Sequence, residues 1–275
     1  MSRPRRCGVL GDPIAHSLSP VLHRAGYSAL GLDWTYDAHR VPSGGLGDFL
    51  AGLDDTWRGL SLTMPLKREV VPLLDRLTDR ARLAGAVNTL LLEDSGERVG
   101  DNTDLPGAAA AIRERTTMPL ASAAILGGGA TAGSVGLALA DLGVTSFEVL
   151  VREPSRATET VDVLRSHPAG VDVLVKTLDD AGRLATDVVV STIPAEAQTR
   201  SRVRRCADVP VVFEALYDPW PTPLAAAAAD RVLVSGLDLL VHQAALQLTL
   251  FTGLEAPLAA MREAGLVALA ARSQA

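Results

Sequence analysis

Two serines stand at the start of an amphipathic segment, in a position suited to binding an anion. Residues 11–20 read Gly-Asp-Pro-Ile-Ala-His-Ser-Leu-Ser-Pro, so that Ser17 and Ser19 come just before a proline and the apolar-periodic run 21–30. Hydroxyls followed by a proline mark a helix N-terminus. Such an end presents unpaired N–H groups and partial positive charge, which suit a carboxylate. One serine alone would simply cap the helix, so the pair, together with His16, favours a substrate-anion site.

A lysine and a run of polar side chains each follow a predicted strand. Residues 59–67 read Gly-Leu-Ser-Leu-Thr-Met-Pro-Leu-Lys, a strand that runs into a proline-bounded turn carrying Thr63 and Lys67. Residues 100–104 read Gly-Asp-Asn-Thr-Asp. In α/β proteins ligands bind at the carboxyl ends of strands, where the Lys67 ammonium and the Asp101 carboxylate could meet and shuttle one proton. Taken singly, the lysine is more often a surface charge and the Asp-Asn-Thr-Asp run a helix cap.

A glycine-rich turn later in the chain has the surroundings of a dinucleotide site. Residues 127–132 read Gly-Gly-Gly-Ala-Thr-Ala, follow the apolar strand 123–126 and precede the helical run 135–142. This G-x-G-x-x-A pattern supplies a tight turn, close backbone approach to a pyrophosphate and a helix end that faces it.

The strand after this loop ends in side chains that bear on the choice of cofactor. An NAD site usually has an acidic residue there, and an NADP site an arginine near the extra phosphate. Arg152 occupies the position of the acid, and Arg156 lies one helical turn further on. Glu153 opposes this reading, because a carboxylate near a phosphate weakens binding. On balance these residues favour NADP and leave NAD open.

Strands and helices alternate along the chain, which predicts α/β layers with mainly parallel sheets. The first series of expected strands is 7–10, 34–39, 58–63 and a hairpin of 90–92 with 98–100. The second series is 123–126, 147–151, 171–175, 187–191, 209–213 and 232–234. Residues 236–272 are expected to form two helices broken near Gly253 and Pro257.

Composition favours an enzyme of ordinary size that acts on a small molecule. A chain of 275 residues can form two domains, and a net charge of −6 without a basic run speaks against nucleic acid. Two cysteines, Cys7 and Cys206, make no disulfide framework, and no Cys/His spacing predicts a metal site. No apolar run is long enough to span a membrane, and residues 11–13 interrupt any signal-peptide segment. We therefore expect a cytoplasmic protein.

Together these motifs resemble the shikimate dehydrogenase family over nearly the whole chain. The family's opening signature, G-x-P-I-x-H-S-x-S-P-x-x-H, stands here from Gly11 through His23. The remaining motifs follow in the family's order: T-x-P-x-K at Thr63, Pro65 and Lys67, A-V-N-T at Ala86 to Thr89, D-N-T-D at Asp101 to Asp104, the nucleotide loop at Gly127, Tyr217, Thr222-Pro223-Leu224, Gly236-Leu237 and His242-Gln243-Ala244-Ala245.

The resemblance implies an α/β fold of two domains separated by a cleft. Residues 1–104 plus 239–275 would form an α/β substrate-binding domain, and residues 105–238 a Rossmann-like NADP-binding domain. The implied activity is an oxidoreductase reaction, the reversible NADPH-dependent reduction of 3-dehydroshikimate to shikimate in chorismate and aromatic amino-acid biosynthesis. Because the cofactor carries the redox step, no metal is needed.

The resemblance also implies roles for individual residues. Lys67 and Asp101 would form the catalytic proton-transfer pair, since a cation and proton source near the ketone oxygen lowers the barrier to hydride arrival. Which of the two is the formal acid stays open, because such a pair titrates as a coupled unit. The implied substrate-binding residues are Ser17 and Ser19 for the carboxylate, then Ser61, Thr63, Asn88, Tyr217 and Gln243. The implied cofactor-binding residues are Gly127, Gly128, Gly129, Ala130, Thr131, Ala132, Arg152, Arg156, Thr192, Ile193 and Gly236.

The chain departs from the family pattern at several positions. Ser61 stands where the family often has asparagine, and the N-R-T of the phosphate clamp reads Val151-Arg152-Glu153. Asp238 falls where glycine is common, and would favour a helix N-terminus.

Two other functions stay open at this point. A quinate/shikimate dehydrogenase that uses NAD would differ mainly around Arg152 and Glu153. A nucleotide-sensing protein without catalysis would have no need of both Lys67 and Asp101, so their presence speaks against it. The expected partners are a small-molecule substrate and neither nucleic acid nor membrane, and a homodimer is left open.

Overall fold

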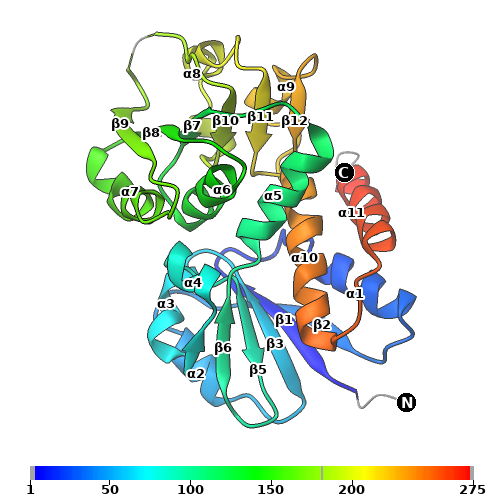
Figure 1. The fold of residues 1–275 in the computed structure, drawn as a ribbon. Coiled ribbons are helices and arrows are strands. Elements are labelled where there is room, and N and C mark those ends of the chain that lie inside the picture. Colours follow the sequence, from blue (N-terminus) through cyan, green and yellow to red (C-terminus); the bar gives the residue numbers. More distant parts are fainter. Residues whose placement is uncertain (1–3, 181, 273–275) are drawn as a thin grey trace. The chain divides into compact units, whose positions relative to one another are not determined.

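The computed structural model describes residues 4–180 and 182–272, shown in Figure 1. The chain divides into two compact units, each with its own sheet. Unit 1 comprises Met1–Thr103 and Leu240–Ala275, and unit 2 comprises Asp104–Leu239. Helix α5 begins where unit 2 begins, and helix α10 runs through the second boundary.

Unit 1 contains a sheet with helices on both faces. Its strands are β1 (Arg6–Gly11), β2 (Thr35–Arg40), β3 (Trp57–Leu62), β4 (Arg76–Leu77), β5 (Thr89–Leu92) and β6 (Arg98–Asp101). Its helices are α1 (Ser19–Ala29), α2 (Leu46–Ala51), α3 (Leu66–Glu69), a 3₁₀ turn at Val71–Leu73, α4 (Asp79–Ala84), most of α10 (Gly236–Thr252) and α11 (Leu258–Arg272).

The described residues of unit 1 form a six-stranded sheet in the order β2-β1-β3-β5-β6-β4. Strand β1 is parallel to β2 and β3, whereas β5 is antiparallel to β3 and β6. Side chains alternate across β3: Leu60 and Leu62 pack in the cluster that includes Leu46 of α2 and Leu66 of α3. On the opposite face, a Cβ at Gly59 would lie 2.2 Å from Phe251 of α10.

Unit 2 is a doubly wound parallel sheet. Its strands are β7 (Ser122–Leu126), β8 (Ser146–Val151), β9 (Asp172–Thr177), β10 (Val188–Ser191), β11 (Val211–Glu214) and β12 (Val232–Val234). Its helices are α5 (Asp104–Arg115), α6 (Ala130–Asp141), α7 (Thr158–Arg165), α8 (Arg200–Arg205), α9 (Pro223–Ala226), the first turn of α10 and 3₁₀ turns at Pro154–Ala157 and Ala195–Ala197.

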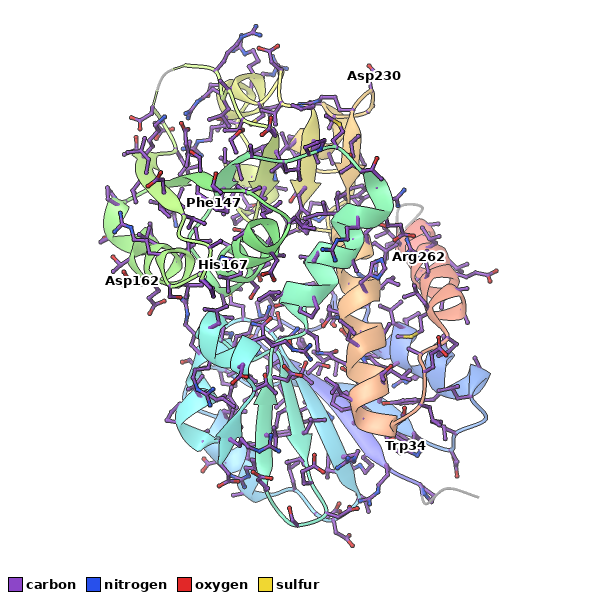
Figure 2. The ribbon with its side chains drawn as sticks, viewed as in Figure 1. Trp34, Phe147, Asp162, His167, Asp230 and Arg262 are labelled. Atoms are coloured by element: carbon purple, nitrogen blue, oxygen red, sulfur yellow. The ribbon has the colours of Figure 1, made fainter. Side chains whose placement is uncertain are left out.

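The strand order in the described part of unit 2 is β12-β11-β10-β7-β8-β9, with every pair parallel. This is the order of a dinucleotide-binding Rossmann fold, whose ligands bind where the order reverses, here between β7 and β10. Helices α5, α6 and α7 pack on one face in a cluster that includes Phe147, a side chain 1% exposed and labelled in Figure 2. Helices α8 and α9 pack on the other face through Val203, Cys206 and Leu224.

The predicted α/β class, both strand series and the β5–β6 hairpin are confirmed, as are the two C-terminal helices on either side of Gly253. Three details differ. The short strand β4 was not predicted, because two residues carry no periodicity. The first helix begins at Ser19 rather than at Pro20. The alanine run at 225–229, whose composition predicts a helix throughout, is helical only to Ala226, where α9 ends.

Candidate active site

The carboxyl ends of β1 and β3 are joined where the predicted serine and lysine motifs begin. Asp12 N–H donates to the Met64 carbonyl at 3.0 Å, and Thr63 N–H donates to the Leu10 carbonyl at 2.9 Å. Gly11 permits this approach, because a Cβ there would lie 2.3 Å from Thr63 Cγ2 and 2.9 Å from the Met64 carbonyl oxygen. The motifs containing Ser17 and Lys67 therefore leave neighbouring strands at one edge of the sheet.

Ser17 and Ser19 stand at the start of α1, as predicted. Ser17 Oγ accepts a hydrogen bond from Ser19 N–H at 3.3 Å, and the N-cap residue Leu18 gives the helix no side-chain cap. Ser19 is 4% exposed and Ser17 is half-buried. The Ser19 N–H is therefore already bonded and Pro20 has none, so the two hydroxyls and the partial positive charge of the helix end are what this position offers to an anion.

Lys67 and Asp101 are connected through two adjacent residues of one segment. Lys67 lies in α3, and its carbonyl accepts from Val87 N–H at 2.7 Å. Asp101 ends β6, and its carbonyl accepts from Asn88 N–H at 3.1 Å. The backbone of Lys67 and the backbone of Asp101 are thus hydrogen-bonded to two consecutive residues, Val87 and Asn88. Thr63, which precedes α3, is half-buried.

Asn88 and Gln243, 155 residues apart in sequence, are brought into contact. Asn88 Nδ2 donates to Gln243 Oε1 at 3.2 Å and to Thr103 Oγ1 at 3.0 Å. Asn88 Oδ1 accepts from Thr103 N–H and Thr89 Oγ1, each at 2.8 Å. Both side chains are buried, at 1% and 7% exposed. The Asn88 amide is therefore held in one orientation.

Ser61 differs in its surroundings from the other predicted substrate ligands. Its hydroxyl accepts from Tyr36 OH at 2.5 Å and donates to Gln247 Oε1 at 2.7 Å. Gln247 in turn donates to Thr89 Oγ1 and to the Asn88 carbonyl, both at 3.0 Å. Ser61 is 4% exposed and uses its one donor within this network, so it supports the site from behind. Gln247 was not among the predicted site residues, although its spacing of four from Gln243 places both on one helix face.

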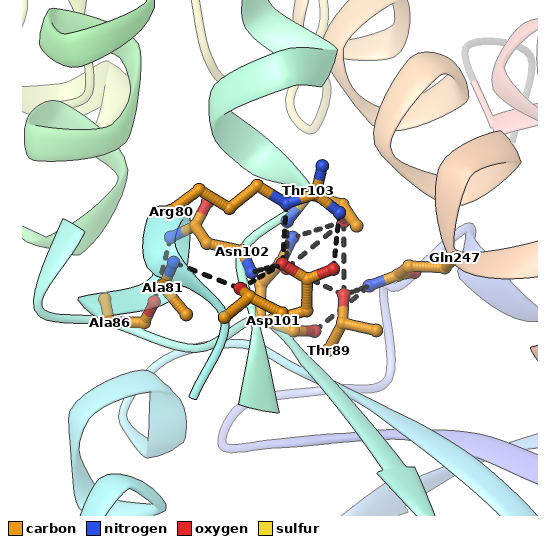
Figure 3. Close-up of polar contacts among 10 residues, drawn as sticks. Arg80, Ala81, Ala86, Thr89, Asp101, Asn102, Thr103 and Gln247 are labelled. Carbon is orange, nitrogen blue, oxygen red and sulfur yellow. Dashed lines mark hydrogen bonds and ion pairs between the residues drawn. The ribbon is translucent and has the colours of Figure 1, made fainter. Parts of the chain in front are cut away.

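The Asp101 carboxylate is held by Arg80, which the sequence analysis also missed (Figure 3). Arg80 Nε donates to Asp101 Oδ1 at 2.6 Å, and Arg80 Nη2 pairs with Oδ2. Thr78 Oγ1 and Asn102 N–H donate to Oδ1, each at 2.7 Å. Burial alone would raise the pKa of Asp101, but hydrogen bonds from Arg80 and Thr78 and the guanidinium charge lower it below its ordinary value. No sequence motif predicts the pairing of Arg80 with Asp101, because the two residues are 21 positions apart.

The glycine-rich loop of unit 2 has the close approaches that a dinucleotide site requires. Gly127 has φ 116°, and a Cβ there would lie 2.2 Å from Thr192 Oγ1. A Cβ at Gly128 would lie 2.4 Å from the Arg156 carbonyl oxygen. Gly129 is the N-cap of α6, which starts at Ala130. The remaining loop residues follow the expected pattern, with Thr131 half-buried and Ala132 0% exposed against the sheet.

Glycine at 127 and 128 thus lets the loop pack against Thr192 and the Arg156 carbonyl, and the open space around Gly129, before the N-terminus of α6, suits a pyrophosphate. Thr192 follows β10, at the switch point of the sheet, and its N–H and Oγ1 both donate to the Leu126 carbonyl. Ile193 is 6% exposed and packs in the core, which leaves its backbone for a ligand contact.

Arg152, Glu153 and Arg156 lie beyond the end of β8, and all three are exposed. Glu153 Oε2 is 3.9 Å from Arg156 Nε. This weak exposed pair directs the carboxylate toward Arg156. Arg152 immediately follows the strand, at the position where the sequence predicts the phosphate-binding arginine.

Tyr217 and Gly236 belong to segments that contact each other in unit 2. A Cβ at Gly236 would lie 2.5 Å from the Ala215 carbonyl oxygen, so glycine is needed where α10 begins. Glu214, fully buried at the end of β11, anchors the Tyr217 segment. It accepts from Thr222 Oγ1 at 2.8 Å, from Gln198 Nε2 at 2.7 Å and from Leu216 N–H at 3.1 Å.

The described ranges contain neither a candidate metal site nor a candidate membrane span. No group of three or more His, Cys, Asp or Glu side chains in residues 4–180 and 182–272 could hold a metal ion. No helix in that part of the chain is long and apolar enough to cross a membrane.

Two family models match the chain. The model described as the shikimate dehydrogenase substrate binding domain matches residues 9–90. The model described as the shikimate 5'-dehydrogenase C-terminal domain matches residues 236–264.

Individual proteins of the same kind match the chain over almost its whole length. Shikimate dehydrogenase (NADP(+)) of Moorella thermoacetica is 35% identical over 267 residues, which cover 92% of this chain and 90% of that protein. The crystal structure of Mycobacterium tuberculosis shikimate dehydrogenase has a TM-score of 0.85 at 42% identity, covering 98% of this chain and all of that one. Quinate dehydrogenase of Corynebacterium glutamicum in complex with NAD has a TM-score of 0.85 at 30% identity, covering 96% and 100%.

Proposed function

The chain belongs to the shikimate dehydrogenase family, and we propose that it catalyses the reversible NADPH-dependent reduction of 3-dehydroshikimate to shikimate. The family predicted from the motifs is thereby confirmed. The observation that carries the activity is the buried cluster in unit 1, where Asn88, Asp101 and Gln243 converge from three distant segments. Fixed polar groups of this kind suit a substrate with several hydroxyls, since an analogue that lacks one leaves a partner unsatisfied.

Unit 1 is the proposed substrate-binding domain. Ser17 and Ser19, at the positive end of α1, bind the substrate carboxylate. Thr63, Asn88, Asp101 and Gln243 bind the ring hydroxyls and the reacting oxygen, and Tyr217 is proposed to contribute a further contact. Ser61 acts indirectly, by holding Gln247 beneath Asn88.

Unit 2 is the proposed NADP-binding domain. The loop Gly127–Ala132 is proposed to bind the pyrophosphate, and the support is that it joins β7 to the N-terminus of α6 with open space around the Gly129 Cα. Arg152 and Arg156 bind the additional phosphate, and Thr192, Ile193 and Gly236 lie along the path to the nicotinamide. NADPH, when bound, supplies the hydride.

Lys67 is the proposed proton donor. As hydride reaches the carbonyl carbon, negative charge develops on the ketone oxygen, and the ammonium group stabilises that charge and transfers a proton to it. In the reverse direction the neutral amine accepts the proton from the substrate hydroxyl. Asp101 hydrogen-bonds the substrate and orients the Lys67 ammonium.

We place the enzyme in the cytoplasm, and the support is that both cysteines, Cys7 and Cys206, are free and buried. We also propose a homodimer as its assembly. The support is a pair of exposed apolar side chains on α11, Leu266 at 54% and Val267 at 65%. Light scattering after size-exclusion chromatography measures the mass directly.

The function is tested by steady-state oxidation of shikimate and of quinate, each with NADP and with NAD, followed by the absorbance of the reduced nicotinamide. We expect turnover with shikimate and NADP and a much lower kcat/KM for the other three pairs. Preference for NAD or quinate would instead identify a quinate/shikimate dehydrogenase. Nucleotide binding without turnover of any pair would indicate a sensor.

The same assay isolates the contribution of Arg152. Arg152→Ala removes charge-assisted hydrogen bonds, which are worth about 1.5–3 kcal/mol, so KM for NADP should rise on the order of tenfold to a hundredfold. The KM for NAD should hardly change. Arg165→Ala, at the exposed end of α7, is the matched control and should leave both values unaltered.

A further inference from the structure

Arg80 lies outside the family motifs, yet its side chain contacts the proposed catalytic residue Asp101 directly. Its guanidinium meets both oxygens of Asp101, with Nε on Oδ1 and Nη2 on Oδ2, as Figure 3 shows. Asp101 is 1% exposed, and the Arg80 side chain is 36% exposed. A two-point contact of this kind fixes the plane of the carboxylate as well as its charge.

The helix that carries Arg80 is itself attached to Asp101. Thr78 is the N-cap of α4 and accepts from Ala81 N–H at 3.3 Å. The same hydroxyl donates to Asp101 Oδ1 at 2.7 Å. The helix ends at Gly85 in the left-handed conformation, with φ 58°. One turn of helix thus presents two donors to one carboxylate.

The contacts divide unequally between the two carboxylate oxygens. Oδ1 accepts from Thr78, from Arg80 Nε and from Asn102 N–H, whereas Oδ2 accepts from Arg80 Nη2. An ionised carboxylate has about four acceptor positions on its two oxygens. The remaining capacity is therefore on Oδ2, the oxygen available to a substrate hydroxyl or an ammonium group.

Several charged groups on the surrounding elements have partners of their own, and in the described part of the chain neither Arg68 of α3 nor Arg98 of β6 is hydrogen-bonded to the Asp101 carboxylate. On α4, Arg82 pairs with the fully exposed Asp79. On β4, Arg76 pairs with Glu97. On α3, Glu69 accepts from Ser43 and Gly44, and Lys67 is the proposed acid. Strand β5 reads Thr-Leu-Leu-Leu and has no titratable side chain. Within the described residues, Arg80 is thus the cation that contacts the Asp101 carboxylate.

We propose that Arg80 is a positioning residue that keeps Asp101 anionic and directs Oδ2 toward the reacting groups, so that Lys67, and not Asp101, carries the transferred proton. This inference rests on the proposed function. It also answers a question that the motifs left open, since a carboxylate held by a permanent cation does not take up a proton at neutral pH. The lowered pKa of Asp101 agrees with this division of roles.

The test compares Arg80→Met and Arg80→Lys with the matched control Arg82→Met, an exposed arginine on the same helix. For Arg80→Met we expect kcat at neutral pH to fall on the order of tenfold or more, and the acidic limb of the pH profile of kcat/KM to move to higher pH. The dissociation constant for NADP should not change. Arg80→Lys restores the charge without the two-point contact, so it should recover the pH profile more fully than kcat.

A second measurement keeps the inference separate from the proposed function. Carbon-13 NMR titration follows the Asp101 carboxyl directly, with its signal assigned by its loss in Asp101→Asn. In Arg80→Met this carboxyl should titrate at higher pH than in the parent protein, whether or not shikimate is the substrate. An unchanged titration in folded Arg80→Met, or in the equally uncharged Arg80→Gln should the former not fold, would overturn the role of Arg80. Inactivity of the parent protein with shikimate would overturn the proposed function alone.

Discussion

Lys67 and Asp101 come from motifs 34 positions apart, yet the backbone links them through Val87 and Asn88. Their chemical environments differ. Asp101 is buried and surrounded by donors, whereas Lys67 is half-buried on a short helix that follows a turn. A flexible ammonium can approach a substrate oxygen, and a fixed carboxylate can orient it.

Replacing Lys67 with alanine should therefore separate chemistry from cofactor binding. We expect Lys67→Ala to lower kcat by about 10²–10⁴-fold, the usual contribution of a positioned acid. The dissociation constant for NADP, measured by calorimetry, should stay within about twofold of the parent value. The neighbouring variant Arg68→Ala serves as the control and should keep most of the activity. Equal losses of kcat and NADP affinity in Lys67→Ala would mean that the lysine is structural.

Helix α10 connects the site to the rest of the chain. Gln243 and Gln247, one turn apart, contact Asn88 and Ser61 from the same helix face. The start of the helix is fixed by a capping box, in which Asp238 N–H donates to Ser235 Oγ at 3.1 Å and Asp238 Oδ2 accepts from Ser235 N–H at 2.9 Å. Arg115 at the end of α5 adds an ion pair to Asp238 at 2.7 Å. The aspartate that departs from the family pattern thus has a structural role at the helix N-terminus.

Loss of this cap should destabilise the protein without affecting the reacting groups directly. Asp238→Ala removes a buried cap and leaves a half-exposed arginine, so the free energy of unfolding should fall by about 1–2 kcal/mol. Urea unfolding followed by circular dichroism measures the change. Glu263→Ala, at an exposed position of α11, should change it by less than about 0.5 kcal/mol. A loss no larger than that of the control would contradict the structural role of Asp238.

Asp101 in unit 1 and Asp238 in unit 2 are buried carboxylates, each held by an arginine, and both should contribute to acid stability. Burial would raise the pKa of both Asp101 and Asp238, but hydrogen bonds from Arg80 and Arg115 outweigh it and lower both values. Glu214 acts in the opposite direction, because burial raises its pKa despite its donors.

A carboxyl group with a lowered folded-state pKa contributes stability above its unfolded-state pKa of about 4, and that contribution is lost as the pH falls through the folded-state value. The free energy of unfolding should therefore decline as the pH drops below about 4. Urea titrations at a series of pH values test this, and Asp101→Asn should flatten the decline. Asp79→Asn, on a fully exposed aspartate, should not. An unchanged slope in Asp101→Asn would mean that acid stability originates elsewhere.

The alternation of apolar segments was enough to predict both strand series, the β5–β6 hairpin and the break between the last two helices, because these features depend on neighbouring residues. The motifs likewise predicted that Asn88 and Gln243 act together and that the chain turns tightly at Gly127, whereas the need for glycine at 128, the variable position of the G-x-G-x-x-A pattern, appeared only in the structure. Folding decided the rest. Ser61 supports the site from behind because Tyr36 and Gln247 use its hydroxyl, and Arg80 reaches Asp101 because α4 places it there. Such pairings join residues that are far apart along the chain. They depend on distance and burial in three dimensions, so a local pattern of residue types cannot predict them.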